Sequence, residues 1–215
     1  MKCQLALTAV FILFVLGCGN SSAVVQLNSN AVAQNQAVAS PNSFQPFLIY
    51  ADKGTRDNHY VPSGFMPDGK CLSLDDAWTE NCHGGKSCIK IVYDTVCSKP
   101  GRKWAGIYWL NPANNWGSQK GGFNLTGAEK LTFWARGEKG GERLEEIKIG
   151  GIIGEYPDSD SAVIGPVILT SEWKEYTIDL RGKDLSSISG GFAWSAKEEV
   201  NPSGCAFYLD DIQYE

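Results

Sequence analysis

Short segments rich in Val, Ile, Tyr, Phe and Trp, separated by Gly, Pro, Asn and Asp, fill most of the chain after residue 45. This pattern is typical of β-strands joined by turns. In the segment 131–136, Leu131, Phe133 and Ala135 fall on one face of an extended chain. No stretch shows an apolar stripe with the 3.6-residue period of a helix. The predicted strands are Phe47–Asp52, Ile89–Asp94, Trp104–Leu110, Lys130–Arg136, Ile147–Ile153, Val163–Leu169, Trp173–Leu180, Gly191–Ser195 and Ala206–Tyr214.

About nine strands with turn-rich connections predict an all-β fold, a two-sheet antiparallel β-sandwich over residues 45–215. A segment of about 170 residues is long enough to bury one core of its own. We find no internal repeat and no second domain in the sequence.

Residues 1–17 contain an early Lys2 and an apolar run too short for an ordinary membrane span, which predicts a secretory signal. The sequence Val15-Leu16-Gly17-Cys18 resembles a bacterial lipobox, which implies a diacylglycerol on Cys18. The alternative is an ordinary signal that contains a cysteine. Residues 18–44 carry no charge and no clear period, so we expect a flexible tether. We expect lipid anchoring in the bacterial cell envelope. No aspartate follows Cys18 directly, which, by resemblance to lipoprotein sorting in Gram-negative bacteria, implies the outer membrane.

The chain has 215 residues, with 19 basic and 24 acidic side chains and a formal net charge of −5. The sequence has no basic stripe to displace counterions from phosphate, which argues against binding to nucleic acid. Seven tryptophans exceed what the core of so small a domain needs. Their position is therefore the main functional question.

Five cysteines follow the predicted tether, which agrees with an oxidising compartment. Cys71, Cys82, Cys88 and Cys97 allow three pairings, of which we favour Cys71–Cys88 with Cys82–Cys97. Cys205 is left as a free thiol that packs as a small apolar side chain. A zinc site at Cys82, His83 and Cys88 is a weaker alternative, because the paired short spacings of structural zinc sites are absent.

The segment 104–117 holds four aromatic rings followed by two neighbouring carboxamides. On a strand, Trp104, Gly106 and Tyr108 share one face and Ala105, Ile107 and Trp109 share the other. One face belongs to the core, and the other presents rings on which a sugar can stack while amides bind its hydroxyls. The alternative is that these rings fill the core and the asparagines cap a turn. The candidate carbohydrate-binding residues are Trp104, Tyr108, Trp109, Asn114, Asn115, Trp116 and Trp194.

Asp210 and Asp211 are adjacent in an otherwise apolar strand, so one carboxylate is expected to point inward. A buried carboxylate needs a partner, and calcium, with its hard oxygen ligands, is one candidate. Asp52 joins the site if the two terminal strands are neighbours. The alternatives are pairing with Lys or Arg, or exposure on an edge strand. His59 lies in a polar loop and is a candidate contact residue, although a structural role is more common.

The sequence shows no nucleophile elbow, no Ser/His/Asp set and no phosphate-binding loop. Glycoside hydrolysis usually needs two carboxylates across a cleft. The acidic residues available for such a pair are Glu145, Glu146, Glu155, Asp158 and Asp160. We therefore expect a binding protein and no enzyme.

Five segments together resemble a known family: Tyr50-Ala-Asp52, Trp104-Ala-Gly-Ile-Tyr-Trp109, Leu131-Thr-Phe-Trp-Ala-Arg-Gly137, Trp173-Lys-Glu-Tyr-Thr-Ile-Asp-Leu180 and Phe207-Tyr-Leu-Asp-Asp-Ile212. The family is that of jelly-roll carbohydrate-binding modules with a galactose-binding-like fold, often attached to bacterial glycoside hydrolases. The resemblance implies a structural calcium held by Asp52 with Asp210 or Asp211. It also implies glycan binding on the concave sheet or on the loops at one end.

From the residues and the resemblance together we expect a monomeric, non-catalytic lipoprotein that binds a polysaccharide or glycan at the cell surface. One alternative is a glycoside hydrolase or polysaccharide lyase on a jelly-roll scaffold. Another is a structural or protein-binding surface lipoprotein without a glycan ligand.

Overall fold

The computed structural model describes residues 44–67, 69–97 and 103–215. The predicted signal sequence, Cys18 and the tether up to residue 43 lie outside these residues. None of the described residues forms a helix of the length and apolar character that crossing a membrane requires. The described elements, in chain order, are β1 (Phe47–Tyr50), β2 (Val61–Met66), β3 (Leu72–Trp78), β4 (Cys88–Tyr93), the 3₁₀ turn η1 (Thr95–Cys97), β5 (Trp104–Leu110), β6 (Lys130–Gly137), β7 (Arg143–Leu144), β8 (Glu146–Gly150), β9 (Ser161–Ile164), β10 (Val167–Ile168), β11 (Lys174–Asp179), β12 (Gly190–Lys197) and β13 (Cys205–Tyr214).

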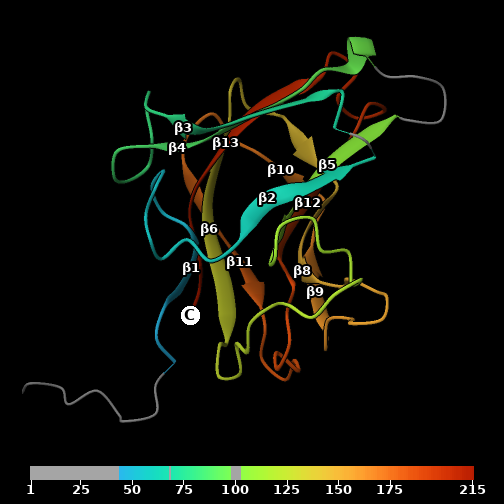
Figure 1. Ribbon diagram of the computed structural model, residues 1–215. Helices are drawn as coiled ribbons and strands as arrows, with labels where there is room; N and C mark the ends of the chain where they lie inside the picture. Colours follow the sequence, from blue (N-terminus) through green and yellow to red (C-terminus); the bar gives the residue numbers. More distant parts are fainter. Residues whose placement is uncertain (1–43, 68, 98–102) are drawn as a thin grey trace, which may run out of the picture. The chain divides into compact units, whose positions relative to one another are not determined.

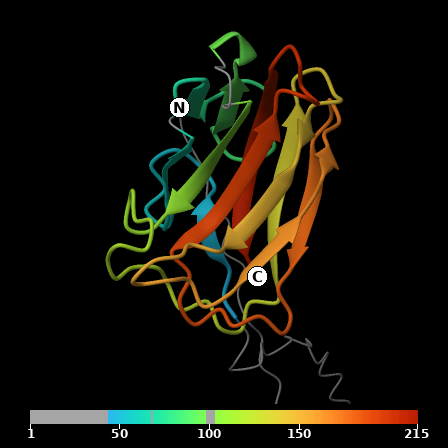
Figure 2. The same ribbon diagram turned by 90° about the vertical axis from the view of Figure 1, so that its right-hand side faces the viewer.

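The strands form two main antiparallel sheets (Figures 1 and 2). Sheet 1 has the order β11-β6-β13-β4-β3, with β1 also paired to β13. Sheet 2 has the order β2-β5-β12-β8-β9, and β10 and β7 form a separate small pair. The predicted two-sheet antiparallel β-sandwich is confirmed.

The core lies between the sheets and follows from strand alternation. In sheet 2 the inward residues include Ile107, Trp109 and Trp194, all at most 1% exposed. The Trp194 ring meets Phe207 of sheet 1 edge to face at 4.8 Å between centroids, and Trp109 meets Phe192 at 5.4 Å. The rings of Trp109 and Trp194 therefore belong to the core, and the prediction that a sugar stacks on them is wrong.

The segment 54–87 contains two strands, β2 and β3, that are not among the predicted ones. Strand β2 contains Pro62 and Gly64, and β3 contains Asp75 and Asp76, all residue types that are depleted in strands. Both are edge strands, where fewer apolar positions are needed because one side of the ladder is open.

The predicted strand Val163–Leu169 is divided into β9 and β10. Gly165 has φ 139°, and a Cβ there would lie 2.3 Å from the carbonyl oxygen of Glu145. The chain therefore turns between the two strands at a position that only glycine fits.

The β3–β4 hairpin determines the disulfides, which are Cys71–Cys97 and Cys82–Cys88. In its register Leu72 lies opposite Tyr93 and Trp78 lies opposite Cys88. Cys71 and Cys97, which flank the open end of the hairpin, are thus brought together in one pair. Cys82 and Cys88, which lie near its turn, form the other. The predicted pairing Cys71–Cys88 with Cys82–Cys97 is wrong, because it crosses this nested arrangement.

Cys205 is a free, buried thiol, as predicted. Burial, together with the nearby charge of Glu142, raises its pKa to about 12. The thiol is therefore protonated at neutral pH and behaves as a small apolar side chain.

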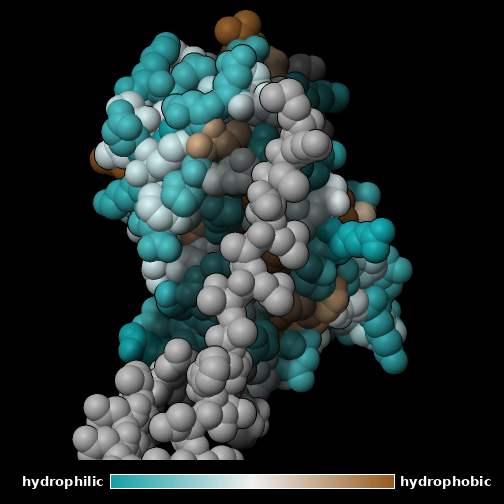
Figure 3. Space-filling view, turned by 90° about the vertical axis from the view of Figure 1, so that its left-hand side faces the viewer, coloured by the Kyte–Doolittle hydropathy of each residue, from teal (hydrophilic) through white to brown (hydrophobic). Residues whose placement is uncertain are grey.

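The surface on the side of β1, β3 and β4 is mainly hydrophilic, with small separate hydrophobic areas (Figure 3). Large exposed apolar side chains occur elsewhere too, including Trp116 at 43% exposure. Scattered exposure of this kind is ordinary for a folded protein, so exposure alone does not identify a site.

The buried position of Trp109 leads to a first prediction. Trp109→Ala removes a fully buried ring and leaves a cavity, so it is expected to lower the free energy of unfolding by about 3–5 kcal/mol. Denaturant unfolding measures this loss. A change below about 1 kcal/mol, the size typical of many surface substitutions, would contradict the core assignment.

Candidate functional site

The outer face of sheet 2 carries the second set of side chains of β5. Because Ala105, Ile107 and Trp109 point into the core, Trp104, Gly106 and Tyr108 point outward. The register places Ala193 of β12 beside Tyr108 and places Lys148 of β8 beside Ala193. One row of side chains thus runs across three neighbouring strands.

This face contains a depression of about 320 Å³. Its lining residues are Met66, Trp104, Tyr108, Glu145, Glu146, Lys148, Ala193, Trp194, Ser195 and Lys197. Gly106 lets Met66 and the backbone of β12 pack closely beside the depression: a Cβ on Gly106 would lie 2.5 Å from the Trp194 carbonyl oxygen and 2.9 Å from Met66 Cε.

Trp116 extends the aromatic surface from Tyr108. The two rings meet edge to face with centroids 5.7 Å apart. Gly64 of β2 permits this contact, because a Cβ there would lie 2.9 Å from the Trp116 ring and 2.8 Å from Tyr108 Cβ. Tyr108 itself is only 4% exposed, and its hydroxyl donates to the Gly150 carbonyl oxygen at 3.1 Å.

The loop that carries Trp116 is organised by Asn115, which is fully buried. Its Nδ2 donates to the Gln119 carbonyl oxygen at 2.9 Å, and its Oδ1 accepts from Gly117 N at 3.1 Å. This side chain is committed to its own loop, so its predicted contact with a sugar is wrong. Asn114 is exposed, has φ 61°, and donates its backbone N–H to Ser63 Oγ.

Charged groups of both signs border the depression. Glu145 forms ion pairs with Arg143 at 2.8 Å and with Lys197 at 3.3 Å. Lys148 Nζ lies 5.2 Å from the Tyr108 ring centroid. Burial raises the pKa of Tyr108, and the nearby Lys148 opposes that shift. The face therefore offers hydrogen-bond donors and acceptors without a strong net charge.

The loop after β8 covers one end of this face and is fixed by Asp158. The carboxylate accepts from Ile152 N at 3.0 Å and from Gly190 N at 3.3 Å. Burial raises the pKa of Asp158. Asp160 accepts from Ser161 N and pairs with Lys183 at 3.2 Å. Both carboxylates thus have structural partners, which favours a positioning role for this loop over a catalytic one.

His59 occupies a structural position. Its ring stacks on Phe47 at 3.9 Å between centroids, and its Nδ1 donates to the Leu48 carbonyl oxygen at 3.0 Å. It is not among the residues that line the depression.

The three predicted calcium ligands lie around one loop, but they do not fit a shared cation. Asp52 Oδ1 accepts from the backbone N–H groups of Lys86 and Ser87, and Asp210 Oδ2 accepts from those of His83 and Gly84. Burial raises the pKa of Asp210 to about 6, and the N–H donors oppose that shift. The backbone donors stabilise the negative charge of Asp52 Oδ1 and Asp210 Oδ2, so neither oxygen needs a cation for this purpose.

Another group of potential metal ligands lies nearby. The potential ligand atoms of Cys82, Cys88 and Asp210 lie within 4.8 Å of one another. In the described part of the chain, no other three His, Cys, Asp or Glu residues meet this distance. The two sulfur atoms are already joined in a disulfide. The weaker zinc alternative therefore has no thiolates available in this state.

The aromatic part of the candidate site is predictable from the sequence, but its neighbours are not. Trp104, Tyr108 and Trp116 are predicted, and the structure places them on or beside one face. Met66, Lys148 and Lys197 are not among the predicted residues. Alternation along β8 and β12 carries the signal for the two lysines, since each is an outward position next to apolar inward ones. Met66 belongs to the unrecognised strand β2.

Comparison with known proteins yields structural matches only. No protein-family model and no curated protein sequence matches the chain. A family 30 carbohydrate-binding module of a cellulosomal cellulase of Clostridium thermocellum aligns with a TM-score of 0.52 and 18% identity, over 80% of this chain and 97% of that one. A family 11 carbohydrate-binding module of a cellulosomal cellulase from the same organism aligns with a TM-score of 0.52 and 12% identity, over 80% and 95%. At these identities the likeness establishes the jelly-roll fold.

Asn115 and Asn114 form a matched pair for a test of the Trp116 loop. Asn115→Ala leaves buried N–H and carbonyl groups without partners, so it is expected to lower the free energy of unfolding by about 1–3 kcal/mol. Asn114→Gly can keep the positive φ of this position, so it is expected to change the free energy of unfolding by less than about 0.5 kcal/mol. Denaturant unfolding of both variants measures the difference. Equal small effects would show that Asn115 does not organise the loop.

Proposed function

We propose that the chain is a non-catalytic carbohydrate-binding module whose ligand lies on the outer face of sheet 2. The observation that carries this proposal is the depression of about 320 Å³ lined by Trp104 and Tyr108, with Trp116 in edge contact with Tyr108. Its size falls within the range of about 300–1,000 Å³ that is usual for ligand sites.

The chemistry of the face suits a sugar. Aromatic rings offer apolar area with little loss of conformational freedom, on which the C–H face of a pyranose can stack. Lys148, Ser195 and Glu146 surround the rings with donors and acceptors for hydroxyl groups. Since acidic and basic side chains balance one another here, the face suits a neutral sugar better than a charged one.

The extent of the aromatic surface favours an oligosaccharide over a single sugar. The accessible rings are Trp104 and Trp116, and Trp116 packs on the buried Tyr108, which lies four residues or about 13 Å along β5 from Trp104. Trp116 continues the surface past Tyr108. A family 11 module of similar fold, with a TM-score of 0.50 and 11% identity over 80% of this chain and 96% of that one, has been seen with a β-1,3-1,4-mixed-linked tetrasaccharide. Mixed-linked β-glucan is therefore the first probe to use.

We also propose that the module acts at the bacterial cell envelope as a lipid-anchored monomer. The support is the sequence Val15-Leu16-Gly17-Cys18 after a short apolar run, followed by the uncharged segment 18–44. Cleavage and lipidation at Cys18 would give a tethered domain that can search for polysaccharide near the membrane, with the outer membrane as its expected location.

Aromatic substitutions test the binding face directly. Trp104→Ala and Trp116→Ala are each expected to weaken retention by mixed-linked β-glucan in affinity electrophoresis by at least about tenfold, the effect of losing an aromatic anchor. Trp78→Ala is the matched control, because its ring lies below Lys90 on sheet 1. If Trp104→Ala and Trp116→Ala both fold and are retained as strongly as wild type, the proposed face is contradicted.

Incubation with the same polysaccharide tests the non-catalytic part of the proposal. Of the two carboxylates that line the depression, Glu145 is held in ion pairs with Arg143 and Lys197, which leaves Glu146. Glycoside hydrolysis usually needs two available carboxylates, so no sustained release of reducing ends is expected. Turnover that continues with time and scales with protein concentration would contradict it. Glu146→Gln then shows whether the exposed carboxylate on this face is responsible.

A further inference from the structure

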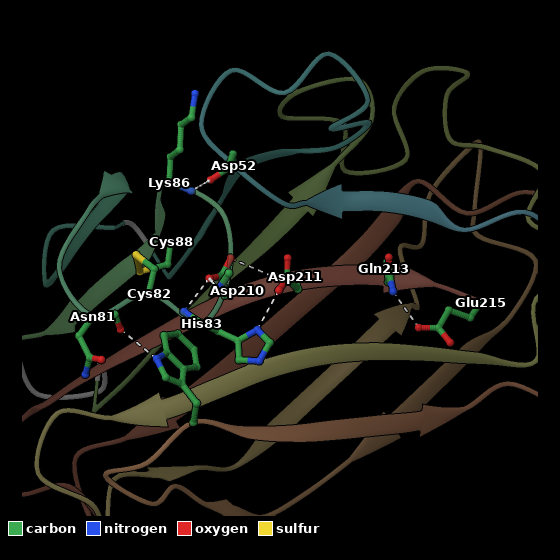
Figure 4. Close-up of polar contacts among 12 residues, drawn as sticks. Asp52, Asn81, Cys82, His83, Lys86, Cys88, Asp210, Asp211, Gln213 and Glu215 are labelled. Carbon is green, nitrogen blue, oxygen red and sulfur yellow. Dashed lines mark hydrogen bonds and ion pairs between the residues drawn. A yellow bond between two sulfur atoms is a disulfide. The ribbon is translucent and has the colours of Figure 1, made fainter.

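The segment between Cys82 and Cys88 lies where the first and last strands meet (Figure 4). Strand β4 pairs with β13 over Cys205–Leu209, while β1 pairs with the other end of β13, at Ile212–Tyr214. Both strands thus lie along β13, one after the other. Between these two pairings, Asp210 and Asp211 pair with neither β4 nor β1, and the register with β6 shifts after Asp210. Asp211 has φ 45°.

The segment 83–87 fills this interruption with backbone N–H groups. His83 N and Gly84 N donate to Asp210 Oδ2 at 3.0 and 3.1 Å. Lys86 N and Ser87 N donate to Asp52 Oδ1 at 2.6 and 2.7 Å. Two carboxylates, one after β1 and one in β13, are therefore bound by the same short loop.

Successive N–H groups pointing at one anion form a nest, which is a recognised way of binding negative charge. Asp210 is fully buried, and an unpaired carboxylate there would be costly. Hydrogen bonds to a charged acceptor are among the stronger ones in proteins. Peptide N–H groups thus supply at this position the positive potential that a bound cation would supply.

Two glycines allow the loop to approach so closely. Gly85 has φ +56°, and a Cβ there would clash with the Asp52 carboxylate. A Cβ on Gly84 would lie 2.8 Å from Asp211 Oδ2. A side chain at either position would push the loop away from the carboxylates.

The loop is also fixed from its outer side. The His83 ring stacks on Trp134 at 3.7 Å between centroids, and its Nδ1 lies 2.9 Å from Asp211 Oδ2. Trp173 Nε1 donates to the Asn81 carbonyl oxygen at 2.9 Å. The Cys82–Cys88 disulfide closes the loop over a sequence separation of 6.

We propose that this disulfide-closed loop, residues 82–88, is a peptide clamp that takes the place of the calcium expected at the chain ends. The clamp joins β1, β4 and β13 without a metal ion. The hydrogen bonds from this loop to the two carboxylates depend on the Cys82–Cys88 disulfide, since its reduction lets residues 83–87 move away from them. The stability of the fold is thus independent of chelators, while the order of this one loop is lost on reduction.

The first experiment compares chelation with calcium on the oxidised full chain. The thermal midpoint and the hydrogen exchange of the His83, Gly84, Lys86 and Ser87 amides are measured with EGTA and with added calcium. Both are expected to be the same in the two conditions. A midpoint that falls with EGTA and recovers with calcium would overturn the proposal, because a cation would then be part of the site.

The second experiment separates the two disulfides. The double variant Cys82→Ser/Cys88→Ser is expected to exchange the amides of residues 83–87 at least about tenfold faster than wild type, as a locally opened segment does. The matched control, Cys71→Ser/Cys97→Ser, removes the other disulfide of the same hairpin and is expected to leave that exchange within about threefold of wild type. Unchanged exchange in the first variant, or equal acceleration in both, would overturn the role of this ring.

A further variant applies if the first double variant does not fold. Gly85→Ala keeps both disulfides and is expected to speed exchange at Lys86 and Ser87, because its Cβ displaces the loop from Asp52. Unchanged protection of those amides would overturn the clamp. None of these measurements involves a glycan, so their outcome is independent of the proposed binding face.

Discussion

The alternation of strand β5 is the constraint on which both the core and the site depend. Sheet 1 buries one face of this strand, so Ile107 and Trp109 are inside and Trp104 and Tyr108 are outside. A shift of one residue would exchange the two sets. The pairing of β5 with β2 and β12 on both sides fixes the register, and with it the aromatic surface available to a ligand.

Small residues on β5 and its neighbours shape that outer face. Gly106 lets Met66 and the β12 backbone pack closely, Ala193 and Ser195 bring small side chains into the lining of the depression, and Gly64 lets Trp116 lie against Tyr108. A flat sheet with larger side chains here would offer rings but no hollow. The same glycine-dependent closeness recurs at the chain ends, where Gly84 and Gly85 let a loop reach two carboxylates.

Strand alternation made the sandwich and the two faces of β5 predictable, but the sequence could not decide which face is buried. That choice depends on the partner sheet, which is far away in sequence. Trp109 and Trp194 were therefore misassigned, although both lie in correctly predicted strands. The edge strands β2 and β3 were missed because Pro62, Gly64 and the Asp75–Asp76 pair obscure their pattern. The disulfide error followed from that, since the pairing reflects the β3–β4 hairpin. The use of backbone N–H groups around Asp52 and Asp210 has no residue-type signal beyond the two adjacent glycines.

Binding of a glycan to the outer face of sheet 2 can be followed by an NMR titration of the full chain with a mixed-linked β-glucan oligosaccharide. We expect shifts of the backbone amides of Gly106, Lys148 and Ser195, with those of Thr132 and Tyr208 on sheet 1 unchanged. Shifts confined to sheet 1, or no shifts with a full panel of neutral oligosaccharides, would contradict it.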